Sequence, residues 1–246
     1  MSNEKYDIET ATEPSDNTRP NPSTSRRRVL AASAILGTAT AGIVPMTSAT
    51  GEDHGDDEAD HGMDAQPPEA VENDFEDDID LLNYARTLEL LEAVFYQRGI
   101  ENIGDEGFRQ HFDGWGPIQD RVADRIRVVR NHEVTHAEVL GQTITQLGGD
   151  PVSSPEFDFG SAVQDPGEFI ATAALLEDVG VSAYAGAAPY IQNAALVPPA
   201  LSIHSVEARH ASFLRELNDE LGFPTPFDQP RSRAEVLELA SGFIVD

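Results

Sequence analysis

The chain has 246 residues, with 44 acidic residues against 16 basic ones, a net charge of -28 and no cysteine. The absence of cysteine excludes disulfides, thiolate metal sites and cysteine nucleophiles. The negative charge argues against binding to nucleic acid or to anionic lipid surfaces, because both would be repelled.

The composition of the basic residues is also unusual. Lys5 is the only lysine, and the other 15 basic residues are arginines. An acidic, lysine-poor surface is typical of proteins from salt-loving organisms, in which abundant counterions screen the self-repulsion of the chain. The charge thus predicts a halophilic, soluble surface and says little about activity.

The N-terminal segment is predicted to be an export signal. Residues 25–30 read SRRRVL and resemble a twin-arginine signal, followed by a mildly apolar run over residues 29–44. This run is shorter than the roughly 20 residues that span a membrane, and small residues at 48 and 49 suit cleavage. We therefore expect residues 1–49 to be a signal peptide and the protein to be extracellular or at the cell surface. A retained N-terminal membrane anchor is the alternative.

Residues 50–76 are acidic, contain Pro-Pro and have almost no apolar side chains. Such a composition cannot bury enough apolar surface to fold and predicts a disordered linker. The pattern changes after this linker, and residues 77–246 are predicted to be one domain.

Four segments of the domain have the helical spacing of inward-facing residues. The first covers residues 77–100 and is expected to end at Gly104, before a loop whose aromatic residues at 108, 112 and 115 would cap the bundle. The second is expected to begin at Pro117 and end at Leu147, before Gly-Gly-Asp-Pro.

The third segment is expected to begin at Asp165 and Pro166, an N-cap followed by proline at the first helical position. The fourth follows Pro198-Pro199 and carries its apolar stripe to Leu221. A short helix over residues 234–241 ends the chain, and residues 152–165 read as a long crossover. No strands are expected. This is an all-α, ferritin-type four-helix bundle with the crossover between the second and third helices.

Each of the four inward stripes carries a glutamate near mid-helix, and two of them add a histidine three residues later. The Glu-x-x-His spacing puts both side chains on one helix face, one turn apart. Carboxylates gathered at one buried point repel each other unless a cation pairs with them. Two iron or manganese ions suit this oxygen and nitrogen set. The candidate ligands are Glu89, Glu133, His136, Glu177, Glu207 and His210.

Two alternatives stay open at this point. Glu92 lies one turn from Glu89 on the same stripe and could replace it as the ligand, although the seven-residue spacing from Glu89 to Tyr96 is repeated from Glu177 to Tyr184. The cluster could also be a hydrogen-bonded network without metal. The two tyrosines could be core residues or could contact the ligands.

The helices also resemble a known family. The segments LLNYARTLELLEAVFYQ, NHEVTHAEVLGQTITQLGGDP, LLEDVGVSAYAGAAPYI and IHSVEARHASFLREL are similar to exported, desiccation-associated ferritin-like proteins. The ending QLGGDP also resembles bacterioferritin. The resemblance covers residues 78–246 and implies a four-helix bundle with a dinuclear metal site, whose ligand positions fall on the six residues named above.

Two functions are consistent with these observations. The first is a di-metal oxidoreductase of the ferroxidase, peroxidase or catalase type, with metal ions and oxygen or peroxide as its partners. The second is a non-catalytic stress or desiccation protein of the cell surface, in which the metal is structural or absent. A 24-subunit storage shell is disfavoured by the linker and the export signal. The sequence does not define the oligomeric state, nor does it choose iron over manganese.

Overall fold

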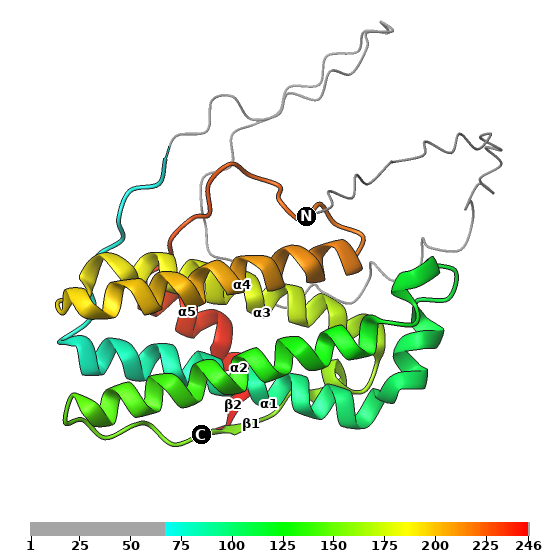
Figure 1. The fold of residues 1–246 in the computed structure, drawn as a ribbon, viewed down its shortest axis with the longest axis horizontal. Coiled ribbons are helices and arrows are strands. Elements are labelled where there is room, and N and C mark those ends of the chain that lie inside the picture. The colour runs from blue at the N-terminus through cyan, green and yellow to red at the C-terminus, as the bar shows by residue number, and fades with distance from the viewer. Residues whose placement is uncertain (1–66, 246) are drawn as a thin grey trace, which may run out of the picture. The chain divides into compact units, whose positions relative to one another are not determined.

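The computed structural model describes residues 67–245, which form a bundle of four long helices and a short C-terminal helix (Figure 1). This confirms the all-α, ferritin-like prediction. The signal peptide and most of the linker lie outside the described residues. The helices are α1 (Asp78–His111), α2 (Val122–Gln146), α3 (Pro166–Ala187), α4 (Val197–Leu217) and α5 (Arg233–Ala240).

The long helices form two antiparallel pairs, α1 with α2 and α3 with α4, and the pairs contact each other mainly through α1 and α3. Aromatic side chains fill the core at one end. Phe95 stacks on Phe169 with ring centroids 4.8 Å apart. Gly99 makes room for this ring, because a Cβ there would lie 2.1 Å from Phe169. Each such buried side chain contributes about 1.5–3 kcal/mol of apolar transfer energy.

The helix starts follow local capping rules. The side chain of Asp77 caps α1 by accepting a hydrogen bond from the amide of Asp80. Asp165 caps α3 by accepting from two backbone amides, and Pro166 follows at the first helical position as predicted. These caps satisfy amide groups that have no partner inside the helix. They set where α1 and α3 begin, and thereby the height at which Glu89 and Glu177 lie.

Helix α3 is apolar around most of its circumference, which suits its place inside the bundle. It is the one helix in the described part of the chain that is long and apolar enough to cross a membrane, and 72% of its apolar window is buried in the protein. Burial against the other helices accounts for this composition.

The structure corrects three predicted boundaries. Helix α1 does not end at Gly104 but breaks there, with φ of 68°, and resumes to His111. Its second part is held by Phe108, whose side chain is fully buried. Pro117 does not open α2 but lies in a 3-10 turn, Gly116–Ile118, and α2 begins at Val122. Helix α4 ends at Leu217, and Leu221, predicted to be on the core stripe, is 52% exposed.

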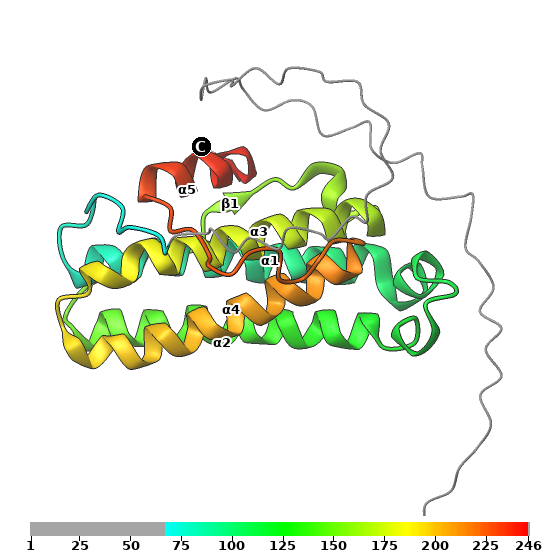
Figure 2. The ribbon, with the colours of Figure 1, turned by 90° about the horizontal axis from the view of Figure 1, so that it is seen from above.

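A two-stranded antiparallel sheet was not expected. β1 (Glu156–Phe157) in the crossover pairs with β2 (Ile244–Val245) near the C-terminus. Two residues per strand are too few for a period to be visible in the sequence. With α5, this sheet lies on the side of the bundle formed by α1 and α3, away from α2 and α4 (Figure 2). The tail therefore covers a side of the bundle and leaves the α2–α4 side open.

Candidate metal centre

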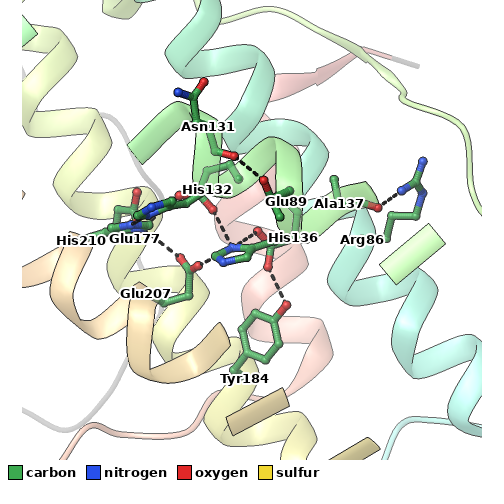
Figure 3. Close-up of polar contacts among 12 residues, drawn as sticks. Arg86, Glu89, Asn131, His132, His136, Ala137, Glu177, Tyr184, Glu207 and His210 are labelled. Carbon is green, nitrogen blue, oxygen red and sulfur yellow. Dashed lines mark hydrogen bonds and ion pairs between the residues drawn. The ribbon is translucent and has the colours of Figure 1, made fainter. Parts of the chain in front are cut away.

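All six candidate ligands come together in the interior of the bundle (Figure 3). The helical spacing accounts for this, because each glutamate lies on the same stripe as neighbouring buried residues of its own helix. The four glutamate side chains are buried, with at most 1% of their surface exposed, whereas His136 lies nearer the rim at 11%. α1 supplies Glu89, α2 Glu133 and His136, α3 Glu177, and α4 Glu207 and His210.

The imidazole of His136 is surrounded by carboxylates from three helices. Its Nδ1 lies 3.2 Å from Oε2 of Glu89, 3.1 Å from Oε2 of Glu133 and 3.0 Å from Oε1 of Glu207. These four residues form one group of donor atoms that lie within 4.8 Å of one another. We call them the His136 group.

The imidazole of His210 has matching surroundings. Its Nδ1 lies 2.9 Å from Oε1 of Glu133, 3.3 Å from Oε2 of Glu177 and 4.0 Å from Oε2 of Glu207. The second group therefore consists of His210, Glu177 and the two glutamates that the His136 group also contains. We call it the His210 group. Glu133 and Glu207 are shared between the groups, each turning one oxygen towards each histidine.

The donor atoms suit bound cations better than a hydrogen-bonded network. Several buried atoms of the cluster make no hydrogen bond within the described part of the chain, although they lie close to one another: Oε1 of Glu133, Oε2 of Glu177, both carboxylate oxygens of Glu207 and Nδ1 of His210. Leaving a buried polar atom without a partner costs about 1–3 kcal/mol. All of these atoms are donors for intermediate or hard cations, so a cation would satisfy them together.

Comparison with known proteins agrees with this geometry. A family model described as "Ferritin-like domain" matches residues 77–220. The chain belongs to the ferritin-like domain family. A search of curated proteins gave no match. The matched region contains all four long helices and all six clustered residues. We call these six residues the ferritin-like centre, and their role as ligands stays a prediction.

Burial and mutual repulsion raise the pKa of most carboxylates of the ferritin-like centre when no metal is bound, which favours their protonated form. Burial, opposed by contacts with His136 and Tyr184, raises the pKa of Glu89 to about 7. Burial and the charges of its glutamate neighbours raise the pKa of Glu207 well above its usual range, and the pKa of Glu177 is also raised. Glu133 is the exception. Burial opposes ionisation there too, but contacts with both histidines lower its pKa to about 2.

The pKa values of the two histidines are raised, whereas burial without a charged partner lowers the pKa of a histidine. Burial alone would lower the pKa of His136, but its carboxylate neighbours outweigh burial and raise the pKa to about 12. The same balance raises the pKa of His210 to about 9. Protons therefore occupy the positions where metal ions would bind, and metal binding must displace them.

Two tyrosines connect the helix pairs. The hydroxyl of Tyr96 on α1 donates to Oε1 of Glu177 on α3 at 2.5 Å, and the hydroxyl of Tyr184 on α3 donates to Oε1 of Glu89 on α1 at 2.5 Å. The repeated seven-residue spacing thus corresponds to a reciprocal exchange of hydrogen bonds. Partners of this kind orient metal-binding carboxylates. The structure therefore shows that the two tyrosines contact candidate ligands and are more than core residues.

Glu92 is buried beside the ferritin-like centre but lies outside both groups of donor atoms. Burial, followed by the charges of Glu177 and Glu207, raises its pKa well above the usual range. Gly180 leaves space for it, because a Cβ there would lie 3.3 Å from Oε1 of Glu92. The geometry therefore favours Glu89 over Glu92 as the donor from α1, with Glu92 as a buried neighbour.

His132 makes a contact that its place in the sequence did not suggest. It is exposed on α2, off the inward stripe, yet its Nδ1 lies 2.9 Å from Nε2 of His210 and the two rings stack. Nε2 is the ring nitrogen of His210 that faces away from the carboxylates. The two histidines are 78 residues apart in the sequence and lie on different helices. No pattern within one helix could therefore have revealed the contact.

Proposed function

We propose that this protein is an exported di-metal oxidoreductase. The observation that carries the proposal is the pair of donor groups that share Glu133 and Glu207 in a buried, helix-lined interior. One ion would be held by the His136 group and one by the His210 group. Two divalent ions would balance the charge of the four carboxylates, which explains why the chain tolerates so many acidic groups at one buried point.

Iron and manganese both accept this ligand set. Two such ions, each changing its oxidation state by one, would supply two electrons, which with two protons convert either dioxygen to hydrogen peroxide or hydrogen peroxide to two molecules of water. Activity of the ferroxidase, peroxidase or catalase type is therefore the proposed chemistry.

The chain's own residues have separate tasks in this proposal. The shared glutamates would each bind both ions, and each histidine would bind one of them. Tyr96 and Tyr184 fix the orientation of the unshared carboxylates through their hydroxyl groups. Burial keeps bulk water away, which strengthens every charge interaction in the interior. Burial and the charges of Glu177 and Glu207 raise the pKa of Glu92 well above its usual range, so in this proposal Glu92 would hold a proton beside the ferritin-like centre.

The decisive experiment measures metal content and turnover together. Protein expressed with its own signal should contain about two iron or manganese ions per chain. Iron- or manganese-loaded protein should consume dioxygen or hydrogen peroxide, and Glu133→Gln should abolish both properties. Metal content near zero, or metal without turnover with either oxidant, would instead support a non-catalytic surface protein that uses the bundle as a scaffold. Native mass measurement would test the 24-subunit shell.

Export is a separate part of the proposal and rests on residues 25–30. The twin-arginine route carries folded proteins, which suits a metal centre that is filled before export. Replacing Arg26, Arg27 and Arg28 by lysine should retain the full-length chain inside the cell. Continued export of this variant would contradict the proposed route.

A further inference from the structure

A small apolar cavity lies beside the ferritin-like centre, at the end of the bundle where α1 and α4 begin and α2 and α3 end (Figure 1). Its volume is about 40 Å³. All four long helices contribute to its walls. The lining includes several alanines, among them Ala85, Ala187 and Ala200, and small side chains at these inward positions leave the space that aromatic rings fill at the opposite end.

The cavity reaches the ferritin-like centre through one residue. The ring of Tyr184 forms part of its wall, and the hydroxyl of the same residue donates to Oε1 of Glu89. The other oxygen of Glu89 lies 3.2 Å from Nδ1 of His136. A molecule in the cavity would therefore be separated from a candidate ligand by a single aromatic ring.

The cavity also reaches the surface. Val139 on α2 and Pro199 on α4 line it, and both residues are exposed. They lie on the α2–α4 side of the bundle, which α5 and the small sheet leave uncovered (Figure 2). The mouth of the cavity is therefore on this side, and neither His136 nor His210 is among its lining residues.

The lining is unsuited to water or hydrogen peroxide. A buried water requires two to four polar partners. The hydroxyl of Thr143 donates to the carbonyl of Val139, and that of Tyr184 donates to Glu89. The hydroxyl of Tyr84 is the remaining side-chain polar group among the lining residues. One such group is too few to hold a water molecule or a peroxide molecule in preference to bulk solvent.

The size of the cavity restricts its occupant further. An apolar cavity of about 150 Å³ accommodates a ring as large as benzene or an atom of xenon. This cavity is much smaller, which leaves room for a diatomic gas or a single noble-gas atom and excludes an organic substrate without rearrangement. Dioxygen is apolar, has this size and is one of the oxidants of the proposed function.

We propose that this cavity is a dioxygen site that leads from the α2–α4 surface to Tyr184, on the Glu89 side of the ferritin-like centre. The inference rests on the proposed oxidoreductase function and narrows it, because it makes dioxygen the oxidant that has a dedicated path. Metal ions and peroxide, which are polar, would approach on the rim where His132 and His136 lie.

Xenon binding tests the site without reference to activity. Crystals of the full domain under xenon pressure should show one xenon atom in the cavity. Ala200→Leu should remove it by filling the space. Ala208→Leu is the matched control, because Ala208 is half-buried on the same helix but lines a separate, wider pocket of about 910 Å³. Absence of xenon in the parent protein, or a bound hydrocarbon chain in its place, would overturn the proposal.

Kinetics with two oxidants test the path. Ala200→Leu should slow oxidation of the iron(II)-loaded protein by dioxygen roughly tenfold, because access limits the encounter rate. The rate with hydrogen peroxide should stay unchanged. Val139→Trp should have the same effect from the mouth of the cavity, where a side chain that is 42% exposed can be enlarged without disturbing the core. Either variant alone decides the question if the other does not fold.

The outcomes separate the two proposals. Equal slowing with both oxidants, or no slowing with dioxygen, would contradict the path while leaving the oxidoreductase function intact. If the parent protein binds no metal and reacts with neither oxidant, the proposed function fails, and the dioxygen role fails with it even where xenon marks the cavity.

Discussion

The His136 group and the His210 group have the same composition but different surroundings. Each contains one unshared glutamate, one histidine and the two shared glutamates. Each unshared glutamate accepts a hydrogen bond from a tyrosine of the opposite helix pair. The differences lie in the residues that surround the two groups. They predict that two candidate metal positions with the same donor atoms behave differently.

The first difference concerns the histidines. Nε2 of His210 lies 2.9 Å from Nδ1 of His132, whereas the polar contacts of His136 run from Nδ1 to carboxylates and its ring lies 6.4 Å from that of His132, between centroids. His136 is also slightly more exposed. The His210 ring is thus held on both sides, and the His136 ring is held on one side at the rim.

The second difference concerns the tyrosines. Tyr96, which donates to the His210 group, packs edge-on against Phe95 and Phe169 in the aromatic end of the core. Tyr184, which donates to the His136 group, belongs to a smaller core cluster with Leu82 and Ile203 and faces the cavity. Tyr96 is therefore packed among aromatic rings, whereas Tyr184 borders a cavity.

The largest expected effect comes from removing a shared ligand. Glu207→Gln should reduce metal content from about two ions per chain to near zero, because both groups lose a donor. The metal-free variant should be at least as stable as the metal-free parent, since an amide is neutral without the free-energy cost of protonating a buried carboxylate whose pKa is raised. Metal analysis and thermal unfolding check the two parts.

Glu177→Gln is the matched variant for this comparison, because Glu177 belongs to the His210 group alone. It should lose about one ion per chain and keep the one held by the His136 group. Equal losses in the two variants would contradict the division into shared and unshared carboxylates.

A second large effect concerns pH and the metal-free protein. The raised pKa of Glu89, about 7 in the folded state against 4.5 for the solvated side chain, means that the folded state holds more protons than the unfolded state between these values. Stability therefore falls as pH rises through this window, by up to about 1.4 kcal/mol per pH unit for each such proton. The raised pKa values of Glu177 and Glu207 also make the folded state less stable as pH rises.

The histidines extend this trend to higher pH. His210, with its pKa raised from 6.5 to about 9, stabilises the fold fully below 6.5 and loses that contribution as pH rises towards 9. Metal-free protein should therefore melt at a lower temperature at about pH 8 than at about pH 5, and metal-loaded protein should show a smaller or reversed trend. Glu133 acts oppositely, but only below 4.5. Melting curves at several pH values, with and without chelator, check the sign.

An intermediate effect should follow from His132→Ala. Loss of the contact with Nε2 of His210 should weaken metal binding at the His210 group by about 10–100-fold, as is usual for partners of ligating histidines. The His136 group should keep its affinity. Asn131→Ala, one residue earlier and also exposed, is the control. Metal titration should show two separate affinities in the variant, and a parallel loss at both positions would contradict the asymmetry.

The smallest effects are expected from the tyrosines. Tyr96→Phe and Tyr184→Phe each remove one hydrogen bond to a carboxylate, at a stability cost of about 0.5–1.5 kcal/mol. Each should weaken one metal position by about tenfold, the His210 group for Tyr96 and the His136 group for Tyr184. Xenon binding should survive in Tyr184→Phe, since the ring still lines the cavity. Identical metal profiles for the two variants would show that the tyrosines do not act on separate positions.

Much of the fold could be predicted because it is local. Helical spacing placed one glutamate on the inward face of each long helix, and Asp165 and Pro166 marked the start of α3 correctly. Predictions failed where tertiary contacts override local signals. Gly104 signalled a helix end, but burial of Phe108 restores the helix after a break. The sheet escaped prediction because its strands pair residues from distant parts of the chain.

The sequence by itself determined that each long helix carries a glutamate on its inward face, joined by a histidine on α2 and α4, because a helix with 3.6 residues per turn keeps residues three and four apart on one face. Only the tertiary structure decided how they divide into groups, that Glu89 and not Glu92 joins them, and that His132 contacts His210. It also decided that one end of the bundle is filled with rings and the other contains a cavity. These features depend on side chains of different helices meeting at distances below 5 Å or so, and no period along a single chain segment carries that information.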